Sequence, residues 1–173
     1  MGQAMTYALK ACRVLYDEHR TVQARLAEVE PLLRRGSPPD AFTKGLATMV
    51  RVLEKELPPH FAKEEEALFP VMESVTGAGF PPVEVMKAEH RFLIDHFQAL
   101  REASAKLTAG PRAADAHGEA TLHLLPLLAT LDDHILKEDS VLLVVACDEL
   151  GPAHDAKILR VFDEIEREGR RWS

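Results

Sequence analysis

The sequence predicts an all-α protein: an antiparallel up-down four-helix bundle with an extra C-terminal helix. Two observations favour this fold. Apolar residues recur at helical spacing, and no stretch keeps the apolar–polar alternation of a half-buried strand. Turn signals divide the chain into long segments, and long helices joined by short loops are typical of bundles. The 173 residues suit one domain with a real core, so we expect a single domain over residues 1–173, with the bundle at about 5–150.

The first two helices are expected to fill the first half of the chain. One is predicted over about residues 6–35, because the Gly and two prolines of RRGSPPD (34–40) end it. Its apolar face combines aliphatic residues with a histidine, in the set Leu15, His19, Val22, Leu26 and Val29. The second helix is predicted over about residues 40–74, with a bend at Pro58–Pro59, because proline interrupts the helical hydrogen-bond ladder.

The second half follows the same plan. After the loop TGAGFPP (76–82), a third helix is predicted over about residues 82–107, with a histidine on its apolar stripe of Val83, Met86, His90, Leu93 and Phe97. After TAGPRA (108–113), a fourth is predicted over about residues 114–150, kinked at Pro126. Gly151–Pro152 ends it. A shorter helix over about residues 153–168 closes the chain and is expected to pack outside the bundle.

The two halves share an internal duplication. EHR occurs at residues 18–20 and again at 89–91, and HFAKEEEALFPV (60–71) aligns with HILKEDSVLLVV (134–145). The shared pattern is H-x-x-K-E-acid-x-x-L-x-x-V. His19 lies 41 residues before His60, and His90 lies 44 residues before His134. Because chance rarely reproduces both a motif and its spacing, each half is interpreted as one helical hairpin.

Helical geometry brings acids and imidazoles onto one face. Residues four apart share a helix face, so Glu64 points with His60, and Glu138 points with His134. The acids that follow point away from that line, Glu65 and Asp139 well off it and Glu66 further round still. Glu65 and Glu66 are interpreted as a solvated face. Six groups are therefore expected to converge inside the bundle: His19, His60, Glu64, His90, His134 and Glu138.

Such a cluster predicts a metal site. Two buried carboxylates repel each other and lose their hydration unless a cation compensates, and neutral imidazoles and carboxylates are metal-binding groups. Two glutamates can bridge two ions, and four imidazoles leave two for each ion, with positions open for a further ligand. Zinc with nitrogen and oxygen ligands prefers a mononuclear tetrahedral site. The ligand set therefore favours two iron ions over manganese or zinc.

The order H…HxxxE…H…HxxxE, over about residues 5–150, resembles the hemerythrin family in its HHE cation-binding branch. The resemblance implies a four-helix bundle around an oxo- or hydroxo-bridged di-iron centre. It implies imidazole ligation by His19, His60, His90 and His134, with bridging carboxylates from Glu64 and Glu138.

One position departs from the family's oxygen carriers, which have HxxxH on the third helix. Ile94 occupies the second histidine position here, and His96 lies about 240° round the helix from His90. The departure argues against reversible oxygen carriage. The chain is more similar to relatives involved in iron sensing, in nitric-oxide or oxidative stress responses, and in repair of damaged iron centres.

Composition argues against nucleic acid and anionic membranes as partners. The formal net charge is −7 at pH 7 and the basic residues are scattered, so we expect neither nucleic acid nor an anionic membrane as a partner. No apolar run approaches the length of a membrane span, and the N-terminus lacks the pattern of a secretion signal. Cys12 and Cys147 lack CxxC spacing and are interpreted as reduced thiols of a cytoplasmic protein.

Three functions stay open. The leading hypothesis is a di-iron protein that binds or senses dioxygen, nitric oxide or peroxide, served by an unidentified electron-transfer partner. The alternative is an enzyme, either a di-iron oxidase or peroxidase or one that repairs iron centres. The Glu-x-x-His motif of ferritin-like oxidases is absent, because no histidine has an acid three residues before it. The third hypothesis is an interaction bundle without metal, which metal binding would not stabilise.

Four further side chains have structural interpretations. His123 shares a face with His134 three turns away and is expected in the core or behind a ligand. His117 and His154 lie near helix starts and are expected to be exposed. Tyr16, one turn before His19, is expected to pack in the ordinary way.

Overall fold

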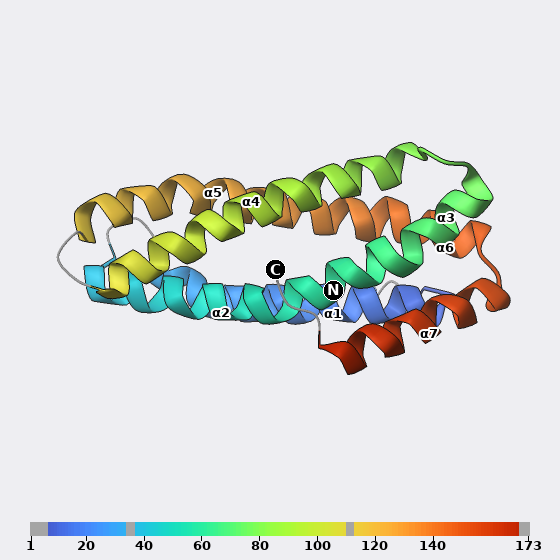
Figure 1. Ribbon diagram of the computed structural model, residues 1–173, viewed down its shortest axis with the longest axis horizontal. Coiled ribbons are helices and arrows are strands. Elements are labelled where there is room, and N and C mark those ends of the chain that lie inside the picture. Colours follow the sequence, from blue (N-terminus) through green and yellow to red (C-terminus); the bar gives the residue numbers. More distant parts are fainter. Residues whose placement is uncertain (1–6, 34–36, 110–112, 170–173) are drawn as a thin grey trace, which may run out of the picture.

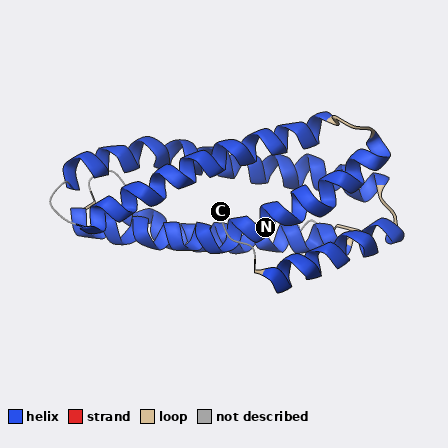
Figure 2. Ribbon diagram, viewed as in Figure 1, coloured by secondary structure: helices blue, strands red, loops and turns tan. Residues whose placement is uncertain are grey.

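The computed structural model describes residues 7–33, 37–109 and 113–169. Over these residues the chain is all-α, as predicted, and no strand occurs (Figure 2). Four long helices lie along the longest axis and run alternately in opposite directions (Figure 1). They are α1 (Lys10–Val29), α2 (Pro39–Lys63), α4 (Pro81–Ala109) and α5 (Ala113–Lys137). The expected ends of the first helix, at residues 6 and 35, lie outside the described residues.

Shorter elements extend these helices. A 3₁₀ turn, η1 (Glu30–Leu32), follows α1. The predicted second helix consists of α2, a π-helical segment η2 (Glu64–Leu68) and α3 (Phe69–Thr76). The predicted fourth helix consists of α5, a second π-helical segment η3 (Glu138–Leu142) and α6 (Leu143–Glu149). The last helix is α7 (Pro152–Glu168).

The π-helical segments were not predicted. Proline suggested a departure from regular geometry at Pro58–Pro59 and Pro126, yet α2 and α5 stay α-helical through these residues. The departure comes later, and each π segment begins at a repeated acid, Glu64 or Glu138. Such segments are rare and are found most often at functional sites.

Two apolar clusters form the core. The first cluster joins the start of α1, η2, α3, the start of α4, the end of η3, α6 and α7. Its buried members include Leu15, Leu68, Met72, Met86, Leu142 and Ile158. The second cluster joins the rest of α1 with α2, α4 and α5, and includes Val22, Leu53, Phe61, Leu93, Leu131 and Ile135. Along α1 and α4, and along α2 and α5 with the segments that extend them, the predicted site residues lie where one set gives way to the other. A polar layer therefore separates two apolar ones.

Helix α7 packs against α1, α2 and η2 outside the four long helices (Figure 1). Its buried residues Ile158, Phe162 and Ile165 recur at helical spacing. At its first turn, Asp155 accepts hydrogen bonds from the backbone N–H groups of Lys10 (3.0 Å) and Ala11 (2.9 Å). A helix N-terminus leaves such donors unpaired, so α7 completes the start of α1. Among the described helices, none combines the length and apolarity of a membrane span.

The turn between α1 and α2 packs tightly on a glycine. A Cβ atom at Gly45 would lie 2.7 Å from Cβ of Leu32 and 3.3 Å from Cδ2 of Leu33. Real Cβ atoms do not approach that closely, and the Cβ of Leu32 is fixed to its backbone. Gly45 therefore permits η1 to lie against α2.

We predict opposite effects for two glycine substitutions. Gly45→Ala should lower the free energy of unfolding by about 1–3 kcal/mol, because the clash outweighs the gain in helix propensity. Gly118→Ala should raise it by about 0.5–1 kcal/mol, because its Cβ would meet nothing within 4 Å in a helix. Denaturant titration measures both values. Equal stabilisation by the two substitutions would contradict the packing described for Gly45.

Candidate metal centre

The structure brings all six predicted residues together. One histidine comes from each long helix: His19, His60, His90 and His134 from α1, α2, α4 and α5. Glu64 and Glu138 are the first residues of η2 and η3. All six residues are buried, and none is more than 3% exposed. Their ligand atoms form two groups, each within 4.8 Å: one of His19, His60, Glu64 and Glu138, the other of Glu64, His90 and His134.

Each glutamate faces imidazoles from two helices. Oε1 of Glu64 lies 3.1 Å from Nε2 of His60, and its Oε2 lies 2.9 Å from Nε2 of His90. Oε2 of Glu138 lies 3.1 Å from Nε2 of His19 and 3.8 Å from Nε2 of His134. The two carboxylates therefore stand where each could bridge two ions.

Every one of these histidines has a carboxylate at its other ring nitrogen. The Nδ1 atoms of His19, His60, His90 and His134 lie 2.7, 2.9, 2.6 and 3.1 Å from carboxylate oxygens of Asp139, Glu18, Glu65 and Glu89, respectively. A carboxylate accepts, so these contacts assign the proton to Nδ1 and leave Nε2 with a lone pair in the neutral ring. Metal-binding histidines are commonly oriented in this way.

The duplication explains this outer ring. The Glu of each EHR motif accepts from the His and the Lys of the HxxKE motif in its own hairpin. Glu18 thus contacts His60 and Lys63, and Glu89 contacts His134 and Lys137. The acid that follows HxxKE instead orients a histidine of the other hairpin. Glu65 of the first hairpin contacts His90 of the second, and Asp139 of the second contacts His19 of the first.

Glu65 was expected on a solvated face and Asp139 off the line of His134 and Glu138, yet each contacts a histidine of the cluster. Asp139 is buried and pairs with both His19 and Arg20, with 2.6 Å to the guanidinium. Glu65 is exposed, as expected, but also accepts a hydrogen bond from His90. The π-helical segments place these acids, and local spacing in a regular helix could not reveal that. The available signal was the alignment of acid with acid at positions 65 and 139. Glu66 is exposed, as expected.

The inner atoms lack hydrogen-bond partners. Both oxygens of Glu64, both oxygens of Glu138, and Nε2 of His90 and His134 are buried without one among the described residues. The Nε2 atoms of His19 and His60 face each other at 3.0 Å. With Nδ1 protonated on each ring, all these atoms are acceptors, and facing acceptors repel. The residues present therefore suit a bound cation, which would satisfy them all.

Electrostatics in the metal-free cluster lead to the same conclusion. Burial opposes a charge on His19, but Glu138 and Asp139 outweigh it and raise its pKa to about 9. Burial and the neighbouring charge of Glu64 raise the pKa of Glu138. Glu64 is also buried, yet His60 and His90 hold its pKa well below the usual range. Without a metal, the raised pKa values of His19 and Glu138 favour protonation of these groups, which offsets the negative charge of the buried carboxylates.

A small void adjoins this cluster. It measures about 10 Å³, close to the space of one water molecule. Three of the candidate ligands line it, His19, His60 and His134, and the rest of its lining is apolar: Val22, Leu57, Phe61, Leu131 and Ile135. Phe61 also stacks on the ring of His90 at 3.8 Å between centroids. The space beside the imidazoles therefore suits a very small molecule.

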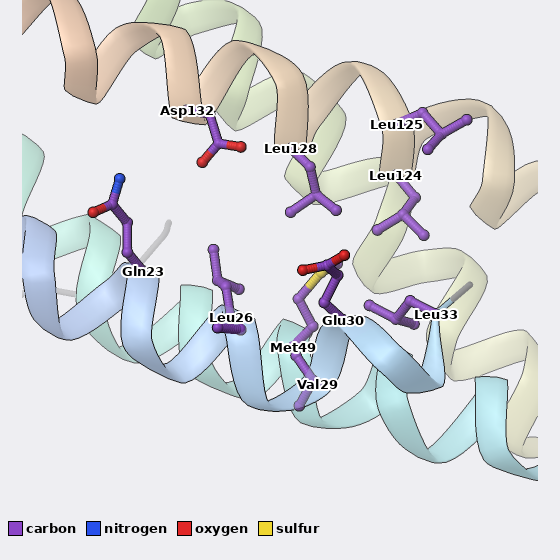
Figure 3. A pocket seen from close by; sticks show the side chains of 11 residues that line it. Gln23, Leu26, Val29, Glu30, Leu33, Met49, Leu124, Leu125, Leu128 and Asp132 are labelled. Carbon is purple, nitrogen blue, oxygen red and sulfur yellow. The ribbon is translucent and has the colours of Figure 1, made fainter.

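A larger groove lies further along the bundle, between α1 and α5. Its volume is about 530 Å³, and Figure 3 shows leucines from both helices facing into it. Its lining includes Gln23, one turn beyond His19, and Asp132, two residues before His134. None of the six candidate ligands lines this groove, so it is separate from the cluster.

The other histidines lie apart from the cluster. His123 was expected in the core or behind a ligand, but it is half-buried and its Nδ1 lies 3.1 Å from Nδ1 of His96. His96 is thus directed away from the cluster, as its position on the helix predicted. His117 is exposed, whereas His154 is half-buried and accepts from the backbone N–H of Gly151. Ile94, at the position of the absent fifth histidine, packs against the second apolar cluster.

Tyr16 packs, as expected. Its ring lies 5.5 Å from that of Tyr7 and beneath the guanidinium of Arg20, at 4.7 Å. Tyr7 donates a hydrogen bond of 2.6 Å to the backbone carbonyl of Asp139. Both tyrosines therefore support the segment that orients His19.

Comparisons with known proteins agree with this site. The family model of the hemerythrin HHE cation binding domain matches residues 11–146. Curated relatives named iron-sulfur cluster repair protein YtfE, from Escherichia coli O139:H28 (strain E24377A / ETEC), Escherichia coli (strain K12 / DH10B) and Shigella boydii serotype 18 (strain CDC 3083-94 / BS512), are each 27% identical over 129 residues. The match covers 73% of this chain but only 59% of each relative's length. No solved structure matches.

We predict unequal roles for Asp139 and Glu65, the two acids that each contact a histidine of the other hairpin. Asp139→Asn should lower metal affinity roughly 10- to 100-fold, because a buried amide orients His19 less well than a carboxylate. Glu65→Gln should cost less, because Glu65 is 46% exposed and water can replace it at His90. Chelator competition measures both, with Asp148→Asn, an exposed acid on α6, as the control. A larger loss in Glu65→Gln than in Asp139→Asn would contradict this ranking.

Proposed function

The chain belongs to the hemerythrin HHE cation binding domain family, and we propose that it is a non-haem di-iron protein that binds a small diatomic molecule or peroxide. His19, His60, His90 and His134 would supply the imidazoles, and Glu64 and Glu138 the bridging carboxylates. Cys12 and Cys147 are free thiols, and we place the function in the cytoplasm, where thiols stay reduced.

One observation carries the proposal: the two groups of ligand atoms have Glu64 in common. The opposite oxygens of that carboxylate face His60 and His90, which belong to different groups. A single ion would leave part of this set unsatisfied, whereas two ions joined through Glu64 and Glu138 would use all of it. The family match supports the same ligand set.

The donor set favours iron. Two imidazoles and two carboxylate oxygens give each ion four donors, fewer than the roughly six that octahedral ions accept. Mixed nitrogen and oxygen donors suit iron or manganese better than zinc. When bound, iron would supply electrons and open positions for a further ligand.

The chain's own residues would select that ligand. Leu57, Phe61 and Ile135 line the void and keep bulk water from the imidazoles. Its small volume, about 10 Å³, supports a very small ligand and disfavours a bulky oxidase substrate. The buried carboxylates Glu18 and Asp139 would keep the rings of His60 and His19 oriented while charge at the centre changes.

Metal analysis and spectroscopy test the proposal. Freshly purified protein should contain about two irons per chain and show oxo-bridge absorption bands that shift on adding azide. Glu64→Gln and Glu138→Gln should lose both iron and bands, whereas Glu149→Ala, at an exposed acid on α6, should keep them. Circular dichroism checks that each variant is folded. Two irons retained in either glutamine variant would overturn the assignment.

A second function, repair of damaged iron–sulfur clusters, is favoured by the name of the relatives. The chain spans about three-fifths of their length, so this activity is a separate proposal. Iron-loaded protein should reactivate an iron–sulfur enzyme that nitric oxide has damaged, and Glu138→Gln should not. Recovery no greater than that given by an equal amount of free ferrous iron would reject repair and leave ligand binding as the function.

A further inference from the structure

The duplication creates two equivalent faces, of which α7 covers only one. The covered face belongs to the first hairpin. The corresponding face of the second hairpin, which no other described helix covers, is called the bare face. We propose that the bare face is a docking groove for an amphipathic helix of a partner protein, with an apolar stripe and an acidic residue like those of α7.

The covered face shows how such a helix binds. Ile158 and Phe162 of α7 lie in the same apolar cluster as Leu15 and Leu68. Lys63 is buried beneath α7, where its ammonium group contacts Glu166 and lies 5.8 Å from the ring of Phe162. An aromatic residue and an acid one turn later thus enclose a lysine.

The bare face has the same positions. It forms a groove of about 270 Å³ lined by Pro82, Val85, Met86, Lys137, Val141 and Leu142. Aligning the EHR and HxxKE motifs matches these residues, in order, with Ala11, Val14, Leu15, Lys63, Ala67 and Leu68. All the apolar members of the second set belong to the cluster on which α7 packs, or lie against it.

The side chains of the two faces differ in their exposure to solvent. Ala67 is 2% exposed beneath α7, whereas its counterpart Val141 is 47% exposed. The side chain of Lys63 is 2% exposed and that of Lys137 is 39% exposed. Val85 is 44% exposed as well. The bare face therefore presents larger apolar side chains than the covered one, and exposed apolar patches mark interaction sites.

The charges define the partner. Lys137 pairs with Glu89 and with Asp133, which is 60% exposed and can yield its place to an incoming acid. The start of α4 has Pro81 and Pro82 where α1 has Lys10 and Ala11, so it lacks the N–H donors that Asp155 satisfies. A partner helix thus needs an acid near its C-terminus, as Glu166 is in α7, to pair with Lys137. It needs no counterpart of Asp155 at its N-terminus. The bare face of a second copy of this chain would bring its own Lys137 instead of an acid, which disfavours a contact between two copies.

A peptide with the sequence of residues 152–168 is the probe. Labelled with a fluorophore, it should bind the full chain and gain helicity on binding. The tethered α7 has an effective concentration in the millimolar range, so micromolar peptide does not displace it. Val85→Asp combined with Val141→Asp should weaken binding roughly tenfold or more, because the charges would be buried. Leu122→Asp, at a leucine 72% exposed elsewhere on α5, should leave binding unchanged.

Three outcomes would overturn the proposal. The first is no binding by full-length protein that circular dichroism and metal content show to be intact. The second is equal binding to the doubly substituted protein and to Leu122→Asp, which would place the peptide elsewhere. The third is a dimer that Val85→Asp with Val141→Asp dissociates, because the face would then be a contact between copies. A peptide carrying Phe162→Glu should fail to bind, which checks that the apolar stripe drives the association.

Discussion

The fold depends on a convergence of acceptor atoms at its centre. Each of the four histidines donates its Nδ1 proton outward to a carboxylate and so directs a lone pair inward. Glu64 and Glu138 direct their oxygens into the same space. An arrangement of acceptors alone is unfavourable in an apolar interior. Positive charge at that point is therefore the condition on which four helices, two π segments and a ring of carboxylates can pack together.

The rest of the polar structure stabilises this centre from outside. Lys63 and Lys137 contact the carboxylates Glu18 and Glu89, and Arg20 contacts Asp139. Positive and negative charge thus alternate outward from His19, His60 and His134, which limits the net charge that the interior must hold. The apolar clusters on either side keep water away and lower the local dielectric, so each of these contacts acts more strongly than it would at the surface.

The sequence revealed the inner ligands because they obey local rules. Spacing of four residues on a helix placed Glu64 with His60 and Glu138 with His134 without knowledge of the tertiary fold. The outer carboxylates bind histidines on other helices, and their partners depend on how the helices pack. The π segments add to this, since they rotate the residues that follow. Cys12 and Cys147 are a similar case: remote in sequence, they meet in the first apolar cluster, where burial and Cys147 raise the pKa of the Cys12 thiol.

The exchange of carboxylates between hairpins has an evolutionary consequence. Asp139 of the second hairpin orients His19 of the first, and Glu65 of the first orients His90 of the second. Neither hairpin alone contains a complete site. Two copies of either hairpin, related by a two-fold axis, would contain four histidines, two inner glutamates and the carboxylates that orient the histidines. An ancestor of half this length could thus have assembled its centre as a symmetric pair. In one fused chain the two halves can differ, and α7 is such a difference, since it packs against α1, α2 and η2 of the first half only.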